Sequence, residues 1–230
     1  MIITIDGPSG TGKSTVAKKI AERMQFAFFD TGAMYRSIAW YIHHKKISFE
    51  NQDVIETLLP HFVFHIEESE GQKRYFVHKH DVTEDIRTPL ITEASSKVSA
   101  YPFVRKLAWS LQREFAKDQN AVFEGRDLGT VVFPSAEVKI FLTAAPEVRA
   151  KRRLKELLAK DPSKTTNFDE VLDKIKQRDA NDSTRAIAPL KKAEDAVEID
   201  TSHLTLDQVV AVCISIIQEK YEHYDLKKTT

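Results

Sequence analysis

The sequence predicts an α/β fold in which helices cover both faces of a parallel sheet, and three observations lead to that prediction. A β-branched run at residues 2–5 is typical of a buried strand. Residues 7–14 form a glycine-punctuated loop, and apolar residues then recur every four positions over 16–24, which indicates a helix. A second apolar run at 26–29 and a second helical pattern at 34–42 follow. Strands and helices that alternate in this order favour parallel strands joined by helices.

Length and composition favour a single globular domain with accessory lobes. The chain has 230 residues, of which 42% are hydrophobic and 30% charged. Lys plus Arg and Asp plus Glu both number 34, so the formal net charge is zero. A protein that binds a nucleic acid polymer usually carries a strongly basic face. The balanced charge therefore argues against that class of partner and leaves small phosphorylated substrates open.

Cys213 is the only cysteine, and it lies in the apolar run 209–214. An intramolecular disulfide is therefore impossible, and we expect a buried thiol in a reducing compartment. The first residues lack the basic segment and long apolar core of a signal peptide, and no run approaches the roughly 18 apolar residues of a membrane span. These patterns predict a cytoplasmic protein with no membrane partner.

The pattern changes between about residues 60 and 85. Phe62, Phe64 and Ile66 alternate with other residues, 69–72 has the composition of a turn, and an apolar run at 75–77 follows. We predict a small antiparallel hairpin inserted into the α/β frame.

The second half of the chain returns to alternating strands and helices. We expect a helix after Thr88, with its hydroxyl as the cap, and another helix from Pro102. The pairs Asn167–Glu170 and Thr205–Gln208 are spaced as capping boxes. The further predicted elements are strands at 121–123, 138–142 and 197–199, a basic helix at 146–160, a polar loop at 161–167, a helix at 167–179 and a last helix toward 221.

One loop carries a complete phosphate-binding motif. The pattern G-x-x-x-x-G-K-[ST] is matched by Gly7, Pro8, Ser9, Gly10, Thr11, Gly12, Lys13 and Ser14, and we include Thr15 in the predicted ATP site. Glycines let backbone N–H groups converge on phosphate oxygens, and the N-terminus of the next helix adds a favourable dipole. We predict that the Lys13 ammonium reaches the β- and γ-phosphates of ATP and that the Ser14 hydroxyl binds Mg²⁺.

This P-loop motif alone leaves the activity open, because GTPase switches, ATPase motors and small-molecule kinases share it. The chain has no N-K-x-D signature for guanine and no D-x-x-G switch motif, and it is short for a motor. The close histidine pairs, His43-His44 and His78/His80, lack the H-E-x-x-H pattern or the cysteines of a zinc site. A small-molecule kinase is therefore the leading prediction.

A kinase with a phosphorylated acceptor needs a second group of cations near the first. D-T-G-A-M-Y-R at 30–36 follows the second predicted strand, and E-G-R-D-L-G-T at 124–130 follows a later one. Ligands collect at the carboxyl edge of such sheets. Arg178, Asp182 and Arg185 are spaced to share one helix face. Each set also has a plain structural interpretation: Arg36 as a surface residue, Asp127 as a turn cap, and the last three as a solvated ion-pair face.

Taken together, these segments resemble the bacterial cytidylate kinases, in their long form. The match runs from I-D-G-P-S-G at the first strand through D-T-G-A-M-Y-R and G-R-D-L-G-T-V-V-F-P to R-D-x-x-D-S-T-R. The resemblance implies a P-loop kinase core with a nucleoside monophosphate (NMP)-binding region at about 33–115, a hairpin insertion at about 60–85 and a helical lid at about 146–178. It also implies γ-phosphoryl transfer from ATP to CMP, and to dCMP, by a monomer.

The resemblance assigns roles residue by residue. The implied acceptor-site residues are Thr31 near the pyrimidine, Tyr35 and Arg36 in the pocket, Arg126 on the phosphate, Ser96, Arg105 and Asp127 on the cytosine edge, and Arg178, Asp182 and Arg185 on the sugar and phosphate. In the lid, Arg149 and Arg153 are implied near the transferring phosphoryl group, with Arg152 as the alternative. Some relatives carry arginine at the position of Asn181, which is a departure within the last cluster.

The chemistry of cytosine supports one of these roles independently. A carboxylate such as Asp127 can accept from the exocyclic amine of cytosine but meets a lone pair on uracil. Two other functions stay open from the sequence: a P-loop kinase for another acceptor, of the UMP, shikimate or gluconate type, and a non-catalytic nucleotide-binding regulator.

Overall fold

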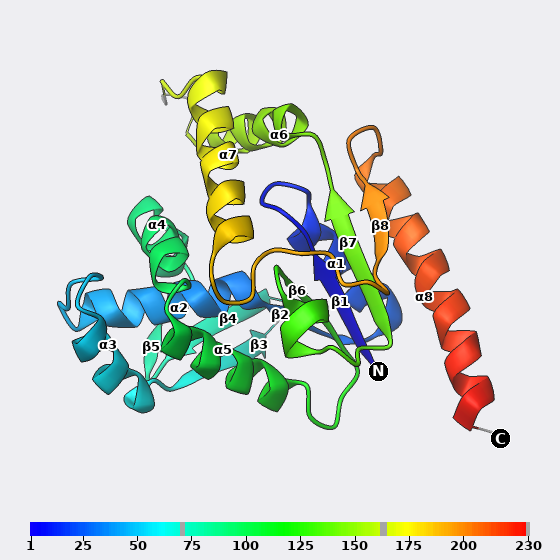
Figure 1. Ribbon diagram of the computed structural model, residues 1–230, viewed down its shortest axis with the longest axis horizontal. Helices are drawn as coiled ribbons and strands as arrows, with labels where there is room; N and C mark the ends of the chain where they lie inside the picture. The colour runs from blue at the N-terminus through cyan, green and yellow to red at the C-terminus, as the bar shows by residue number, and fades with distance from the viewer. Residues whose placement is uncertain (70–71, 162–164, 229–230) are drawn as a thin grey trace. The chain divides into compact units, whose positions relative to one another are not determined.

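The computed structural model describes residues 1–69, 72–161 and 165–228 (Figure 1). The chain forms two compact units, which we call the P-loop unit (Met1–Phe29 with Ala116–Thr230) and the inserted unit (Asp30–Phe115). None of the described helices combines the length and apolar composition that a membrane crossing requires.

The P-loop unit is built on a five-stranded sheet in the order β2-β6-β1-β7-β8. Its elements are β1 (Ile2–Asp6), α1 (Lys13–Met24), β2 (Ala27–Asp30), β6 (Ala121–Gly125), the π-helical turn η3 (Leu128–Val132), β7 (Val138–Thr143), α6 (Pro146–Lys160), α7 (Phe168–Thr184), β8 (Val197–Asp200) and α8 (Leu206–Lys228). β1 pairs in parallel with β6 and β7, and β7 with β8, which confirms the predicted parallel α/β sheet. In register, Asp6 lies opposite Gly125, so the loops after β1 and β6 leave the same edge.

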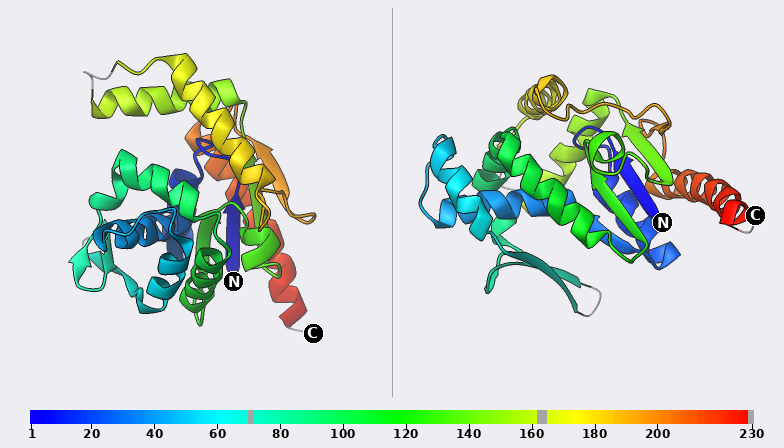
Figure 2. Two further views of the ribbon diagram at one scale, coloured as in Figure 1. Left: turned by 60° about the vertical axis from the view of Figure 1, so that its left-hand side comes forward. Right: turned by 60° about the horizontal axis from the view of Figure 1, so that its bottom comes forward.

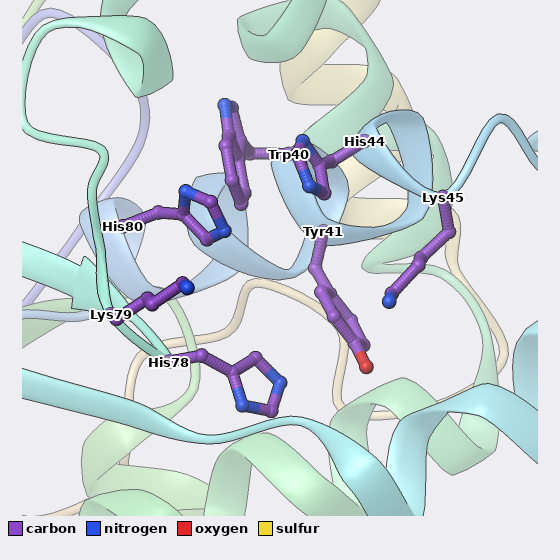
Figure 3. Close-up of a pocket in the computed structure, with 7 residues that line it drawn as sticks. All are labelled: Trp40, Tyr41, His44, Lys45, His78, Lys79 and His80. Carbon is purple, nitrogen blue, oxygen red and sulfur yellow. The ribbon is translucent and has the colours of Figure 1, made fainter.

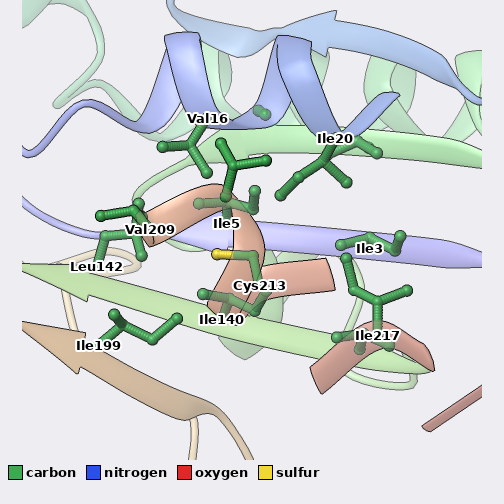
Figure 4. Packing of buried hydrophobic residues seen from close by; sticks show 14 of the residues in the cluster. Ile3, Ile5, Val16, Ile20, Ile140, Leu142, Ile199, Val209, Cys213 and Ile217 are labelled. Carbon is green, nitrogen blue, oxygen red and sulfur yellow. The ribbon is translucent and has the colours of Figure 1, made fainter. Parts of the chain in front are cut away.

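Helices α1 and α8 pack on one face of this sheet and form its core with β1 and β7 (Figure 4). Ile3 and Ile5 of β1 contact this layer because alternate side chains of a strand point to the same face. Cys213 of α8 is buried in the same cluster, as predicted, and burial raises the pKa of its thiol to about 12. An uncharged thiol in an apolar core has a packing role.

Helices α6 and α7 lie side by side and share a small apolar cluster of their own, centred on Ala150, Val171 and Ile175 (Figure 2). The Asn167 side chain accepts a hydrogen bond from the backbone N–H of Glu170 at 2.9 Å, which confirms the predicted cap of α7. The helix continues past the predicted end at residue 179 to Thr184. Residues 162–164 of the predicted polar loop lie outside the described residues.

The inserted unit combines helices with a three-stranded antiparallel sheet. Its elements are α2 (Thr31–His44), α3 (Gln52–Leu58), η1 (Leu59–His61), β3 (Phe64–Ser69), β4 (Gln72–Val77), β5 (His80–Asp81), η2 (Asp85–Arg87), α4 (Pro89–Val98) and α5 (Pro102–Phe115). Strands β3 and β4 form the predicted hairpin, and β5 adds a short third strand. The turn itself, at residues 70–71, lies outside the described residues.

The predicted cap of α4 is wrong. The helix begins at Pro89, but the Thr88 hydroxyl makes no capping hydrogen bond. It donates instead to the backbone carbonyl of Asp85 at 3.0 Å, because η2 ends directly before it and leaves that carbonyl within reach.

Candidate active site

The loop between β1 and α1 takes its shape from three glycines. Gly7, Gly10 and Gly12 have φ values of 146°, 81° and 90°, in the region that favours glycine. A Cβ on Gly7 would lie 2.1 Å from the carbonyl oxygen of Leu142, a distance that no side chain tolerates. Helix α1 begins at Lys13, so its unpaired N–H groups and the positive end of its dipole adjoin the loop. These features are those of a phosphate cradle.

The Lys13 ammonium is buried and donates to the carbonyl oxygen of Pro8 at 2.7 Å. Burial lowers the pKa of this ammonium to about 7, with Arg126 acting in the same direction and Glu124 opposing it. A phosphate in the loop would favour the charged ammonium. An anion bound in the loop would therefore raise the pKa of Lys13 and offer its ammonium a charged hydrogen-bond acceptor.

Ser14 and Glu124 form a second polar pair at this edge of the sheet. The Ser14 hydroxyl donates to Glu124 Oε1 at 2.8 Å, and the glutamate is buried near the end of β6, in register with Ile5 of β1. Hydroxyl and carboxylate oxygens are among the ligands that Mg²⁺ prefers. The pair thus fits the predicted Mg²⁺ site and adds Glu124, to which the sequence assigned no role of its own.

Asp6 is another site residue that the sequence analysis did not single out. Its carboxylate accepts hydrogen bonds from the backbone N–H groups of Leu128 (3.1 Å) and Gly129 (2.8 Å). Burial is the largest cause that raises the pKa of Asp6 to about 7; the two backbone hydrogen bonds oppose it, and the nearby Asp127 adds to it. Asp6 and Glu124 share a signal that sequence reasoning can use: both are acidic residues at the carboxyl end of a predicted buried strand.

Two charged residues that follow β6 pair with two charged residues at the C-terminal end of α7. Arg126 donates to Asp182 at 3.0 Å and to the carbonyl of Gly125 at 3.1 Å. Arg185 lies 3.5 Å from the Asp127 carboxylate and 3.8 Å from that of Asp182. The structure therefore brings two predicted phosphate arginines and two predicted carboxylates into one network.

This network is not a solvated ion-pair face, so that interpretation of the α7 residues is wrong. The Asp182 and Arg185 side chains are only 12% and 9% exposed. Arg178 stands one turn before Asp182 on α7 and is half-buried. Its charge is one of those that lower the pKa of Lys13, which places Arg178 near the phosphate loop. Arg185 lies one residue beyond the helix, at its C-cap.

The side chain of Arg149, a predicted lid arginine, bonds to other groups of this same chain. It is buried, and its guanidinium donates to the carbonyls of Ala144 (2.9 Å) and Ser9 (3.0 Å). It also pairs with Asp179 of α7 at 2.6 Å. Arg149 thus connects α6, α7 and the phosphate loop.

The other two arginines of α6 differ from Arg149. Arg152 donates twice to Thr201, through Nη1 to the hydroxyl and Nη2 to the carbonyl. Arg153 is about half exposed and pairs with Glu156 on the same helix. Of these three side chains, Arg153 is the one whose guanidinium is open to solvent.

In the inserted unit, Arg36 lies beside Asp30, the N-cap of α2. The Asp30 carboxylate accepts from the backbone N–H of Ala33 at 2.8 Å and lies 3.3 Å from Arg36 and 3.6 Å from Arg87. A Cβ on Gly32 would lie 3.1 Å from the Arg36 guanidinium and 3.1 Å from Asp30 Oδ1, so a side chain there would make this pair shift slightly. Arg87 is a second cation at this position that the sequence analysis did not include.

Tyr35 and Arg105 are also brought together in the inserted unit. The Arg105 guanidinium lies 5.6 Å from the Tyr35 ring centroid and 5.7 Å from that of Trp109, and it donates to the carbonyl of Ser99. The side chain of Arg105 is fully buried, which is unusual for a guanidinium without functional or structural reason.

The remaining predicted residues lie on two helices of the inserted unit. Thr31 is buried at the start of α2, and Ser96 is half-buried in α4. The cytosine-edge trio is therefore divided between units, with Ser96 and Arg105 in the inserted unit and Asp127 in the P-loop unit. That these three meet around one base remains a prediction.

Comparison with known proteins decides the family. The family model described as cytidylate kinase matches residues 3–219. The chain belongs to the cytidylate kinase family. The cytidylate kinase of Protochlamydia amoebophila is 51% identical over 212 residues, which are 91% of this chain and 93% of that protein. The cytidylate kinase of Carboxydothermus hydrogenoformans is 46% identical over 220 residues, or 96% and 98% of the two chains.

The predicted resemblance to cytidylate kinases is thus confirmed, and this cytidylate kinase family member is a nucleoside monophosphate kinase, a phosphotransferase. A solved structure described as an uncharacterized protein from Eubacterium ventriosum has a TM-score of 0.51 at 14% identity, covering 95% of this chain and 98% of that one. This likeness concerns the fold alone.

Proposed function

We propose that this kinase transfers the γ-phosphoryl group of ATP to CMP, and also to dCMP, giving ADP and CDP or dCDP. One observation carries the substrate assignment. Arg126 and Asp127 directly follow β6, and β6 pairs in parallel with β1, the strand that leads into the phosphate loop. The guanidinium of Arg126 suits a phosphate, and the carboxylate of Asp127 suits the exocyclic amine of cytosine. The names and high coverage of the relatives support the same substrate.

In this proposal, the buried ion pairs hold the acceptor residues in place before substrate binds. Arg126 and Arg185 are oriented by Asp182 and Asp127 at 3.0–3.8 Å. A nucleotide phosphate would compete with Asp182 for the Arg126 guanidinium, and the base would compete with Arg185 for Asp127. The network thus pre-orients both groups at low entropic cost.

The proposed chemistry needs no general base from the protein. The attacking atom is an oxygen of the acceptor phosphate, whose second pKa is near 6, so it is mostly dianionic at neutral pH. Lys13 would neutralise the β- and γ-phosphates of ATP, while Arg126 and Arg178 would hold the acceptor phosphate in line. Ser14 and Glu124 would hold Mg²⁺, directly or through its water, and the bound ion would neutralise charge on the donor phosphates.

We assign Arg153 as the α6 arginine for the transferring phosphoryl group. Arg149 and Arg152 already donate to protein acceptors, whereas the pair between Arg153 and Glu156 is exposed and therefore weak. In this proposal α6 and α7 form a lid that excludes water from ATP. Arg149 would fix the lid to the phosphate loop.

The substrate proposal is tested by a coupled assay with ATP and Mg²⁺ against CMP, dCMP, UMP, AMP, shikimate and gluconate. We expect turnover with CMP and dCMP and a kcat/KM for UMP lower by about tenfold or more. Preference for UMP, AMP or a non-nucleotide acceptor contradicts the proposal. ATP binding without phosphoryl transfer to any acceptor favours the regulator instead.

The proposal includes two properties of the whole protein. We propose that the kinase acts as a monomer, which light scattering at assay concentration tests. The cytoplasmic location predicted from the sequence also stays a proposal, consistent with one buried thiol.

A further inference from the structure

The inserted unit contains a pocket of about 340 Å³ that none of the predicted acceptor residues lines (Figure 3). Its walls come from the C-terminal half of α2 and from the turn between β4 and β5. Trp40 follows Arg36 by four residues, so the pocket lies about one helical turn beyond that predicted acceptor arginine.

Aromatic rings form one part of the wall. The rings of Trp40 and His44 are stacked at 4.6 Å, and His80 lies 5.0 Å from His44. The Tyr41 ring lies 5.4 Å from that of His78. The Trp40 N–H is satisfied by Asp85 at 3.1 Å, which holds the indole in place. A fixed set of flat rings is a surface on which a planar ligand stacks.

Cations form the rest of the wall. Lys45 lies 5.6 Å from the Tyr41 ring, and Lys79 lines the opposite side from the β4–β5 turn (Figure 3). No carboxylate is among the seven lining residues, and in the described chain neither lysine forms an ion pair. In a chain of zero net charge, this is a local concentration of positive charge beside aromatic faces.

We propose that this pocket is a second nucleotide-type site, which binds an aromatic phosphate ester with its ring on the Trp40 side and its phosphate on Lys45 and Lys79. Stacking and ammonium–phosphate attraction are both needed, because either alone is weak at a solvent-open site. The inference is independent of which nucleotide the active site phosphorylates.

The test uses the Trp109→Phe protein, in which Trp40 is the one remaining tryptophan. ADP and CMP are held at saturating concentration so that the donor and acceptor sites are filled. AMP is then titrated while Trp40 fluorescence is recorded. We expect a saturable change with AMP, and at least tenfold weaker responses to adenosine, which has only the ring, and to inorganic phosphate, which has only the anion.

Two adjacent lysines supply a matched control. Lys45→Glu and Lys79→Glu should each weaken AMP binding by about tenfold or more, while Lys46→Glu, next to Lys45 but outside the pocket, should change it less than about twofold. The proposal is overturned by the absence of a saturable response up to ~10 mM AMP. It is also overturned if adenosine or phosphate alone binds as well as AMP, or if all three charge reversals act alike.

Discussion

The carboxylate of Asp6 accepts a hydrogen bond from the backbone N–H of Gly129 at 2.8 Å. This contact ties the last residue of β1 to the π-helical turn that follows Arg126 and Asp127. Asp6 thus holds the segment that carries Arg126 and Asp127 against the end of β1.

The Asp6 contact predicts a specific dependence of stability on pH. Burial raises the pKa of Asp6 from 3.8 to about 7, so between these values the folded protein binds more protons than the unfolded chain. The contribution of Asp6 to the free energy of unfolding therefore falls as pH rises through this window. Relative to Asp6→Asn, the wild type should lose on the order of 2 to 4 kcal/mol between pH 4 and pH 7.

Urea unfolding of both proteins at several pH values measures this difference. Because the other ionisable groups are common to both proteins, they cancel in the comparison. A difference that stays constant with pH would show that Asp6 is charged throughout.

The Ser14–Glu124 pair predicts a defect in metal use. Glu124→Gln keeps the size of the side chain but removes its charge, so the half-saturating Mg²⁺ concentration should rise by about 10- to 100-fold. The KM for CMP should change little. Glu147→Gln, an exposed acid in the first turn of α6, is the control and should behave like the wild type. An unchanged Mg²⁺ dependence in Glu124→Gln would refute the role.

Asp127 predicts the basis of selectivity between cytosine and uracil. Asp127→Asn should reduce the ratio of kcat/KM for CMP over UMP by about tenfold, because an amide can donate to the uracil carbonyl. Arg185→Gln removes the nearby guanidinium but keeps the carboxylate, so it should lower rates while preserving the ratio. If both variants lose selectivity equally, the ion pair rather than the carboxylate sets it.

Substituting two glycines of the phosphate loop should lower the free energy of unfolding by different amounts. Gly7→Ala places a Cβ 2.1 Å from the Leu142 carbonyl oxygen, and neither backbone can move without disturbing the sheet. We expect a loss of more than about 3 kcal/mol of stability. Gly12→Ala meets no atom within 4 Å, so only its φ of 90° opposes the change, at about 1 to 2 kcal/mol. Thermal or urea unfolding should rank the two in this order.

Substitutions of two arginines of α6 should have different effects: one should lower stability and the other should lower activity. The single ammonium in Arg149→Lys cannot span the three partners that the guanidinium reaches through Nε, Nη1 and Nη2, and it leaves Asp179 poorly paired, so the change should cost about 3 kcal/mol of stability. Arg153→Lys should unfold like the wild type but lower kcat. If Arg153→Lys retains full kcat, the assignment to the phosphoryl group fails.

Local patterns in the sequence were sufficient to predict the parallel sheet, the phosphate loop, the hairpin and the cap of α7. Each rests on neighbours in the chain: the period of apolar residues, the spacing of glycines, or a cap and the N–H three residues away. The capping hydroxyl of Thr88 failed because a second short helix ends at the same residue and competes for it.

The pairing of distant charges was decided by the tertiary structure. The sequence placed Asp6, Glu124 and Asp179 at strand ends or on a helix, but their partners Gly129, Ser14 and Arg149 lie at separations that no local pattern encodes. The same holds for the three arginines of α6, which look equivalent in the sequence. Their different burial follows from the packing of α6 against α7 and the phosphate loop, because a guanidinium can be buried only where carbonyl and carboxylate oxygens surround it.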